Sequence, residues 1–252
     1  MFLSSLEKYI CKPGHSYSQS NNNICLVEQP GVVDVSAGYG APLNQSVLQS
    51  WERLKGLTLT DDIRDFYMSH DGAYLIWKYN HNRNSIVLGN ITINSLDDLS
   101  VFNPFNTCAN TCTPSLYDLQ DKNDDWDPFY CINNKIIIIS SCPDTGHTCL
   151  VFDENSLFRG IWLIDLALNC HLMCDTFSDY LRLCQVHLGL IQWPYSLVGL
   201  DVSNHYKAWF EIFIPKRFLI NNKEQEQDDD SSPVSVHLTT PNFSLYNQRP
   251  MK

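Results

Sequence analysis

The stretch FYMSHDGAYLIWKY, residues 66–79, decides how the first half of the chain folds. Its first residues continue a helical pattern, and its last seven have the apolar and aromatic composition of a strand. Gly72 stands where a helix needs a left-handed residue at its end, and His70 suits the negative end of the helix dipole. Asp71 is a common turn residue. The stretch therefore predicts a helix that stops and a strand that starts.

A catalytic turn is the alternative for the same residues, with His70 and Asp71 placed beside a pocket. That hypothesis needs a nucleophile, a metal or a third polar group nearby, and the surrounding sequence supplies none. The structural interpretation accounts for every residue of SHDG, so we prefer it.

Periodic apolar positions extend this reading along the chain. Two strands, AYLIWKY and SIVLGNITI, are expected to form a hairpin around the five-residue loop NHNRN. Helical spacing and capping residues predict further helices, and short apolar runs predict further strands. The expected helices cover residues 43–55, 60–70, 176–189 (capped by Thr176 and Asp179 and ended by Gly189) and 203–213; the expected strands cover residues 30–38, 135–142, 148–153 and 160–168.

Two polar regions interrupt this pattern. Residues 102–134 are rich in Asn, Asp, Thr, Pro and Cys and are predicted to be an irregular insertion. The tail, residues 214–252, has too few apolar residues to fold alone and is predicted to be disordered. The sequence thus predicts helices and strands over residues 1–213, followed by a polar tail.

Charge and composition narrow the possible partners. The chain has 252 residues and a formal net charge of −11. Up to residue 213 there are 12 Lys and Arg against 23 Asp and Glu, so the folded part carries the negative excess. Nucleic acid and anionic membranes both require basic surfaces, so neither is expected as a partner. No signal peptide or membrane span is recognisable, and the ten cysteines are expected to be reduced thiols.

Cysteine and histidine provide the candidate chemistry. CANTC (108–112) and CHLMC (170–174), with Cys142 and Cys149, have a spacing that structural zinc permits. A cysteine nucleophile would need one of the histidines at 147, 171 or 187. No local signature accompanies either arrangement, and no glycine-rich phosphate loop or serine elbow is present. We therefore expect no catalytic, cofactor-binding or metal-binding residue.

Aromatic residues near the C-terminus are the candidates for binding a partner protein. Trp193, Tyr195, Trp209 and Phe210 flank the connection QWPYSLVGLD, where exposed aromatics could anchor another chain. The alternative is that these side chains belong to the core, and it is the better expectation for tryptophan, which is usually mostly buried.

Several segments carry a family resemblance. LTDDIRDFYMSHDG followed by LGNITINSLDDL resembles the SUKH superfamily of cell-wall assembly regulators and toxin-immunity proteins. More closely, the chain resembles the subunit 2 family of tubulin polyglutamylase complexes over residues 26–213. The matching segments are SWE (50–52), FY (66–67), Gly72, Trp77, LG (88–89), INSL (93–96), Cys142, CLV (149–151), IWLIDLAL (161–168), DTFSDYLRL (175–183), HLGLIQW (187–193) and KAWF (207–210).

The resemblance implies a SUKH-like α+β domain over residues 1–213, in which helices flank a mixed or antiparallel sheet, and it implies that the chain is a non-catalytic subunit. The ATP-dependent ligase activity would belong to a separate tubulin-tyrosine-ligase-like catalytic subunit, and the complex would add glutamate chains to tubulin C-terminal tails. A cytoplasmic, cytoskeletal location at microtubules, centrosome or basal body is implied as well. Residues 13–23 look like an insertion relative to the family, and the short, charge-balanced tail is poorly suited to grip acidic tubulin. Any contact with microtubules is therefore expected to be indirect.

Two other hypotheses remain open. The chain could be a stand-alone SUKH-type module that binds an unrelated protein, or a cysteine- or zinc-dependent enzyme.

Overall fold

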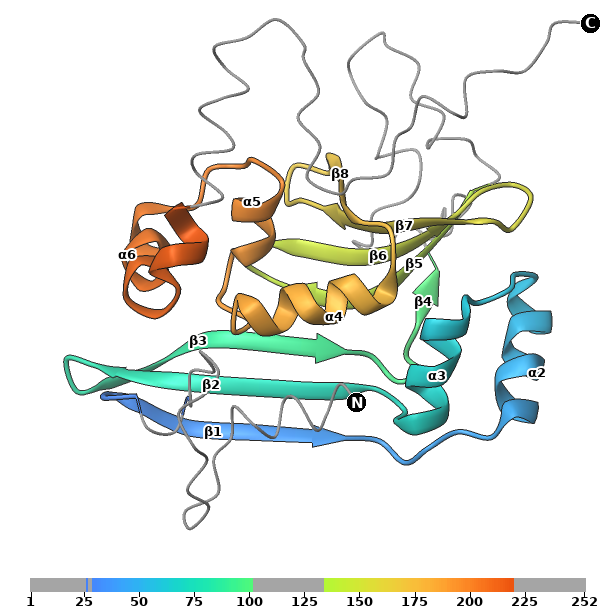
Figure 1. Ribbon diagram of the computed structural model, residues 1–252, viewed down its shortest axis with the longest axis horizontal. Helices are drawn as coiled ribbons and strands as arrows, with labels where there is room; N and C mark the ends of the chain where they lie inside the picture. The colour runs from blue at the N-terminus through green and yellow to red at the C-terminus, as the bar shows by residue number, and fades with distance from the viewer. Residues whose placement is uncertain (1–25, 27–28, 102–133, 220–252) are drawn as a thin grey trace, which may run out of the picture.

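The computed structural model describes residue 26, residues 29–101 and residues 134–219. Within them the chain forms two antiparallel sheets with helices packed between and beside them (Figure 1). The three-stranded sheet has the order β1-β2-β3, and the five-stranded sheet has the order β4-β5-β6-β7-β8. The predicted α+β class is confirmed, but the single sheet expected from the sequence is divided into two.

The elements follow one another in a simple order. The strands are β1 (Val32–Tyr39), β2 (Ala73–His81), β3 (Asn84–Ile93), β4 (Ser100–Val101), β5 (Lys135–Cys142), β6 (Gly146–Phe152), β7 (Phe158–Ile164) and β8 (Cys170–Cys174); the helices are α2 (Gln45–Lys55), α3 (Asp61–Ser69), α4 (Phe177–Val186), α5 (Trp193–Leu197) and α6 (Asn204–Phe213). None of these helices is long and apolar enough to cross a membrane. The predicted insertion, but for Asn134, and the chain before Leu26 lie outside the described residues.

The hairpin of β2 and β3 is tighter than the sequence analysis predicted. The strands continue to His81 and resume at Asn84, so only Asn82 and Arg83 form the turn. Both turn residues have positive φ, 51° and 69°, which is the geometry of a type I′ turn. The five-residue loop was the wrong expectation because Asn tolerates a left-handed backbone and lets the ladder extend into the polar residues.

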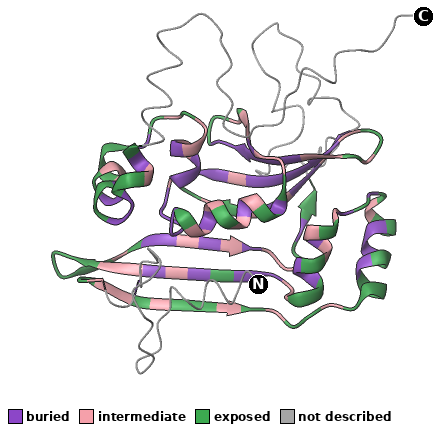
Figure 2. Ribbon diagram, viewed as in Figure 1, coloured by how far each residue is buried: buried purple, intermediate pink, exposed green. Residues whose placement is uncertain are grey.

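The five-stranded sheet is buried on both faces. In β5 the run Ile136–Ile139 alternates between them, because successive side chains of a strand point in opposite directions. Ile137 and Ile139 belong to the main core, whereas Ile136 belongs to a second cluster with Cys149 and Trp162. Burial on both faces explains why this strand reads as a continuous apolar run (Figure 2).

Helix α4 packs between the two sheets. Its N-terminus has the predicted cap, since Thr176 Oγ1 accepts a hydrogen bond from the Asp179 backbone N–H at 3.1 Å. Phe177 is buried and meets Phe66 of α3 edge-on, with ring centroids 5.2 Å apart. The α4 stripe therefore fixes the helical layer to the three-stranded sheet on one side and to β7 and β8 on the other.

The C-terminal boundary of the folded part lies beyond the predicted residue 213. Ile214 and Phe218 are buried, and the Phe218 ring packs against Phe210 at 5.4 Å. Residues 215–219 form another helical turn. The lysine and arginine between these two apolar residues made the segment look like tail, although its apolar positions lie one helical turn apart and reach the core. Residues 220–252 are outside the described part.

Candidate functional site

The residues that join the three-stranded sheet to the segment after α4 are the strongest candidate for a site, because they include the family segment HLGLIQW (187–193). Trp77 of β2 donates from Nε1 to the Leu188 carbonyl oxygen at 2.9 Å. Asn90 N–H donates to Gly189 O at 2.7 Å, and Ile191 N–H donates to Leu88 O at 2.9 Å. The segment after α4 thus lies along β3 like a short extra strand, joined by a bridge between Gly89 and Leu190.

A glycine in β3 makes the Trp77 contact possible. A Cβ on Gly89 would lie only 1.7 Å from Trp77 Nε1, so the indole occupies the space that a side chain would need. Trp77 is fully buried, and its ring packs edge-on against Phe213 of α6 at 4.9 Å. The indole therefore connects the three-stranded sheet to the end of α4 and to α6 at once.

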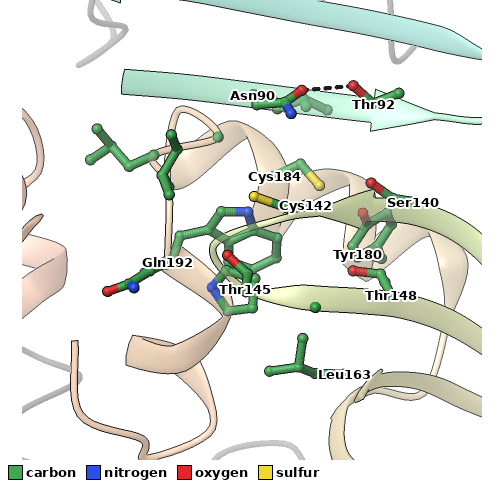
Figure 3. A pocket seen from close by; sticks show the side chains of 17 residues that line it. Asn90, Thr92, Ser140, Cys142, Thr145, Thr148, Leu163, Tyr180, Cys184 and Gln192 are labelled. Atoms are coloured by element: carbon green, nitrogen blue, oxygen red, sulfur yellow. Dashed lines mark hydrogen bonds between the residues drawn. The ribbon is translucent and has the colours of Figure 1, made fainter. Parts of the chain in front are cut away.

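A small cavity lies beside this junction (Figure 3). It measures about 30 Å³ and is lined by β3, the hairpin of β5 and β6, α4 and the segment up to Pro194. Its lining includes Asn90, Ser140, Cys142, Thr148, Tyr180 and Cys184. Pockets for small-molecule ligands are usually about 300–1,000 Å³, whereas this volume suits roughly one water molecule. The cavity can hold solvent but not a substrate.

The side chains around the cavity form a structural network. Burial raises the pKa of the Cys184 thiol to about 12, so the thiolate nucleophile is disfavoured at neutral pH. Burial likewise raises the pKa of Tyr180 well above its ordinary value, and its hydroxyl bonds with Cys184 and Thr148. Across the cavity the Thr92 hydroxyl donates to Asn90 Oδ1 at 2.7 Å (Figure 3). Tyr180 and Cys184 therefore stay protonated at neutral pH.

The turn at His70–Gly72 serves the fold. Helix α3 ends at Ser69, and His70 has an extended backbone, φ −156°, instead of lying in the last turn as predicted. The His70 ring packs edge-on against Tyr39 at 4.8 Å, and desolvation lowers its pKa. Asp71 Oδ1 accepts from Leu96 N–H at 2.7 Å, which ties the turn to the loop after β3.

Gly72 has the predicted left-handed backbone, with φ +77°. It lies two residues beyond the helix cap and not at the helix end itself. A Cβ there would meet the Ile93 carbonyl oxygen and the Ser95 nitrogen, each at 2.8 Å. The glycine is needed because two backbones approach closely, a requirement that the sequence alone did not reveal.

The histidines considered for catalysis have oxygen partners. His147 Nδ1 lies 2.8 Å from Ser141 Oγ, His171 Nε2 lies 3.1 Å from Asp165 Oδ2, and His187 Nδ1 lies 2.8 Å from Leu183 O. The Ser141–His147 contact has the length that nucleophile activation requires. However, its neighbours Ser140 and Thr148 line the cavity, so the pair points to the opposite face of the sheet.

Cysteines in the described part are free thiols. Burial raises the pKa of Cys149 and of Cys174 well above the ordinary value. Among the described residues no group of three or more His, Cys, Asp or Glu side chains could hold a metal ion. Cys108 and Cys112, which the zinc hypothesis also used, lie outside the described part. CHLMC itself forms β8, a strand that the sequence analysis did not predict.

The four aromatic candidates for partner binding separate into two groups. Trp193, Trp209 and Phe210 are buried in the main core, where Trp209 packs on Tyr79 at 4.8 Å and Trp193 stacks on His187 at 4.9 Å. Their burial within the chain leaves them little surface for a partner, as the core alternative expected. Tyr195 is half-buried and keeps part of its ring exposed.

A larger groove lies at the C-terminal end of α2. It measures about 340 Å³ and is lined by residues that include Glu52, Arg53 and Ser156. Glu52 accepts hydrogen bonds from Leu59 N–H and from Arg64, each at 2.8 Å, and Ser156 donates to Gly56 O. Because these polar groups already hold α2, α3 and the β6–β7 turn together, the groove offers no reactive constellation.

Sequence reasoning missed the residues that join the three-stranded sheet to the segment after α4. Trp77 and the segment 187–191 were noticed as parts of a motif, but their pairing across 111 positions has no local signature. The signal that the sequence offered was Gly89, which lies two residues before a buried strand position and opposite a tryptophan. Glycine within a strand often marks a place where another group approaches the backbone closely.

Comparison with known proteins places this arrangement in a family. The SMI1 / KNR4 family (SUKH-1) matches residues 42–183. Tubulin polyglutamylase complex subunit 2 of Mus musculus is 30% identical over 215 residues, which are 81% of this chain and 73% of the relative. The Homo sapiens protein of the same name is 30% identical over 81% of this chain and 71% of its own length. No solved structure matches the chain. The chain therefore belongs to the SMI1 / KNR4 (SUKH-1) family and to the family of tubulin polyglutamylase complex subunit 2.

Proposed function

We propose that this protein is a non-catalytic adaptor subunit of a tubulin polyglutamylase complex, which adds glutamate chains to tubulin C-terminal tails. The observation that supports it is 30% identity, over 81% of the chain, to proteins named as subunit 2 of that complex. In this proposal a separate tubulin-tyrosine-ligase-like subunit carries the ATP-dependent chemistry. The complex works in the cytoplasm on microtubules, at the centrosome or basal body.

The roles of the polar residues agree with an adaptor. Asp71 bonds with the backbone, Asp165 with His171, and His147 contacts Ser141, while the small cavity has room for about a water molecule. The motif residues at 188–191 hold the end of α4 against the three-stranded sheet. A subunit whose shared residues maintain shape fits a role in positioning other proteins.

Charge indicates how such an adaptor would bind. The folded part has the same sign of charge as the acidic tubulin tails, so direct contact between them is repulsive at low salt. Other subunits would instead be held by apolar anchors with a polar rim. Tyr195 is the remaining aromatic candidate, and its hydroxyl lies at the backbone of Leu166, a residue that is 61% exposed.

Affinity purification of the full chain from ciliated or neuronal cells tests the proposal. A tubulin-tyrosine-ligase-like protein should co-purify and remain after a high-salt wash, while the chain alone should sediment poorly with microtubules at physiological salt. Unrelated partners would support a stand-alone SUKH module. Tight, salt-sensitive binding of the chain alone to microtubules would overturn the adaptor role.

The contribution of Tyr195 can be measured in the same complex. Tyr195→Ala should weaken the association by about 1–3 kcal/mol, as truncation of an interface aromatic usually does. Leu54→Ala is a suitable control, because Leu54 is 80% exposed on α2 at the other end of the molecule. Equal affinity of the two variants would remove Tyr195 from the interface.

A further inference from the structure

Strand β1 forms an open edge of the three-stranded sheet (Figure 1). The opposite edge, β3, is closed by the bridge between Gly89 and Leu190 and by the hydrogen bond from Asn94 N–H to Ile139 O. No described strand pairs with β1 on its outer side. Figure 2 shows its residues as exposed or half-buried.

The hydrogen-bond pattern identifies which backbone groups face outward. In β3, backbone groups of Leu88 and Asn90 bond to the segment after α4. The backbone N–H and C=O groups of Gly89, and of the alternate residues that follow it, therefore point to β2. By the same alternation Tyr74 and Ile76 bond to β1, opposite Gly38 and Ser36.

A second observation gives the same assignment of inward-facing and outward-facing residues in β1. Gly40 N–H donates to Gly72 O, which makes this pair hydrogen-bonded and Tyr39 a residue of the outer edge. The N–H and C=O groups of Ala37 and Tyr39 therefore point away from the sheet. They have no hydrogen-bond partner among the described residues.

The edge lacks the usual protection over these positions. Native edge strands are commonly blocked by charges, prolines or bulges. In β1 these features are confined to the start, where Asp34 has φ 51° within a bulge and contacts Lys78 at 3.4 Å. Ser36–Tyr39 is uncharged and exposed apart from half-buried Gly38.

We propose that the β1 edge at Ser36–Tyr39 binds an extended, non-acidic segment of another protein as a fourth strand. Main-chain hydrogen bonds to Ala37 and Tyr39 would supply affinity, as in other cases of strand addition. The Tyr74 ring, 40% exposed, lies over Gly38, where a Cβ would come within 2.8 Å of it. An apolar side chain of the incoming strand opposite Gly38 would pack against this ring.

The negative charge of the chain limits which segment can add to the β1 edge. A second copy would bring another net charge of −11 to the same edge, so self-pairing is opposed, as is pairing with an acidic segment. A neutral or basic segment meets no such repulsion. The inference describes how the adaptor holds a partner, and in that sense it rests on the proposed function.

The test uses random linear peptides displayed on phage and selected against the full chain, followed by anisotropy measurements with one selected peptide. Ala37→Pro removes the outward N–H and breaks no bond to β2, since proline is tolerated where the N–H faces outward from a sheet. It should raise the dissociation constant about tenfold or more, as expected for a lost backbone hydrogen bond plus steric exclusion. Ala37→Ser keeps the N–H and should bind like the wild type.

Hydrogen exchange of the wild-type chain gives a readout that does not depend on the variant. The peptide should slow exchange at Ala37 and Tyr39, whereas Ser36 and Gly38 should be protected with and without it. Unchanged exchange at Ala37 and Tyr39, failure to select any peptide, or a concentration-dependent dimer that Ala37→Pro abolishes would each overturn the inference. If peptides bind at β1 but no polyglutamylase subunit co-purifies, the proposed function fails while the inference stands.

Discussion

Replacing Trp77 by Phe should test whether this side chain holds the end of α4 to the three-stranded sheet as the structure indicates. The change removes the indole N–H that donates to Leu188 O at 2.9 Å and leaves that acceptor without its partner. An unsatisfied buried group costs about 1–3 kcal/mol. The smaller ring also leaves a void of roughly 40 Å³, or about 1 kcal/mol if the surroundings do not relax. We expect a loss of about 2–4 kcal/mol in the free energy of unfolding.

Urea unfolding and thermal melting measure this loss. For a chain of this size each kcal/mol lowers Tm by about 2–4 °C, so Tm should fall by roughly 5–15 °C. In native-state hydrogen exchange the Asn90 amide, which bonds to Gly189 O, should open more readily than in the wild type.

Trp51→Phe is the matched control, since Trp51 is also buried, at 8% exposure, but its indole N–H makes no hydrogen bond within the described part of the chain. It should lose only the packing contribution, about 1 kcal/mol. If Trp77→Phe were no more damaging than Trp51→Phe, the assignment of the Trp77–Leu188 bond as the link between β2 and the end of α4 would be refuted.

Three further predictions concern Gly72, the turn residues Asp71 and His70, and His187. Gly72→Val should lower the unfolding free energy by more than about 2 kcal/mol, because φ is +77° and a Cβ meets backbone atoms; an unchanged Tm would contradict this. Asp71→Ala should cost about 1–2 kcal/mol and His70→Ala less, and polyglutamylation by the complex should fall only with the subunit's abundance, measured by immunoblot. Burial lowers the pKa of His187 to about 4, so the unfolded chain binds an extra proton below about pH 6.5. The free energy of unfolding should therefore fall by up to about 3 kcal/mol between pH 6.5 and 4. His187→Phe should reduce this dependence of stability on pH, measured by urea unfolding at each pH.

Local signals in the sequence predicted local structure well. The Thr176 cap appeared as expected because a hydroxyl accepting from the N–H three residues later needs no distant partner. The alternation of β2 and the stripe of α4 followed from side-chain period in the same way. The predicted end of the helix at His70 was wrong by one residue. Capping and glycine preferences are local, and they do not reveal that the backbone at the end of β3 packs against the turn.

Distant pairing could not be read from the sequence. Whether Trp193 and Phe210 face solvent depends on which elements fold over them, and this is decided by contacts far away along the chain. Strand β8 was missed because its alternation is weak, with four of its five residues half-buried. The open edge of β1 is likewise a property of strand order, which a single sequence does not specify.

The bond between Trp77 and Leu188 also has a consequence for folding during biosynthesis. The donor leaves the ribosome 111 residues before its acceptor. At roughly 5–20 residues per second this interval lasts about 6–20 s. During this interval the apolar face of β2 lacks its packing partners in α4 and α6, since Trp77 packs on Phe213 and Tyr79 packs on Trp209. The nascent chain should therefore be a client of ribosome-associated chaperones until the end of α6 has emerged, and truncations before α4 should aggregate rather than fold.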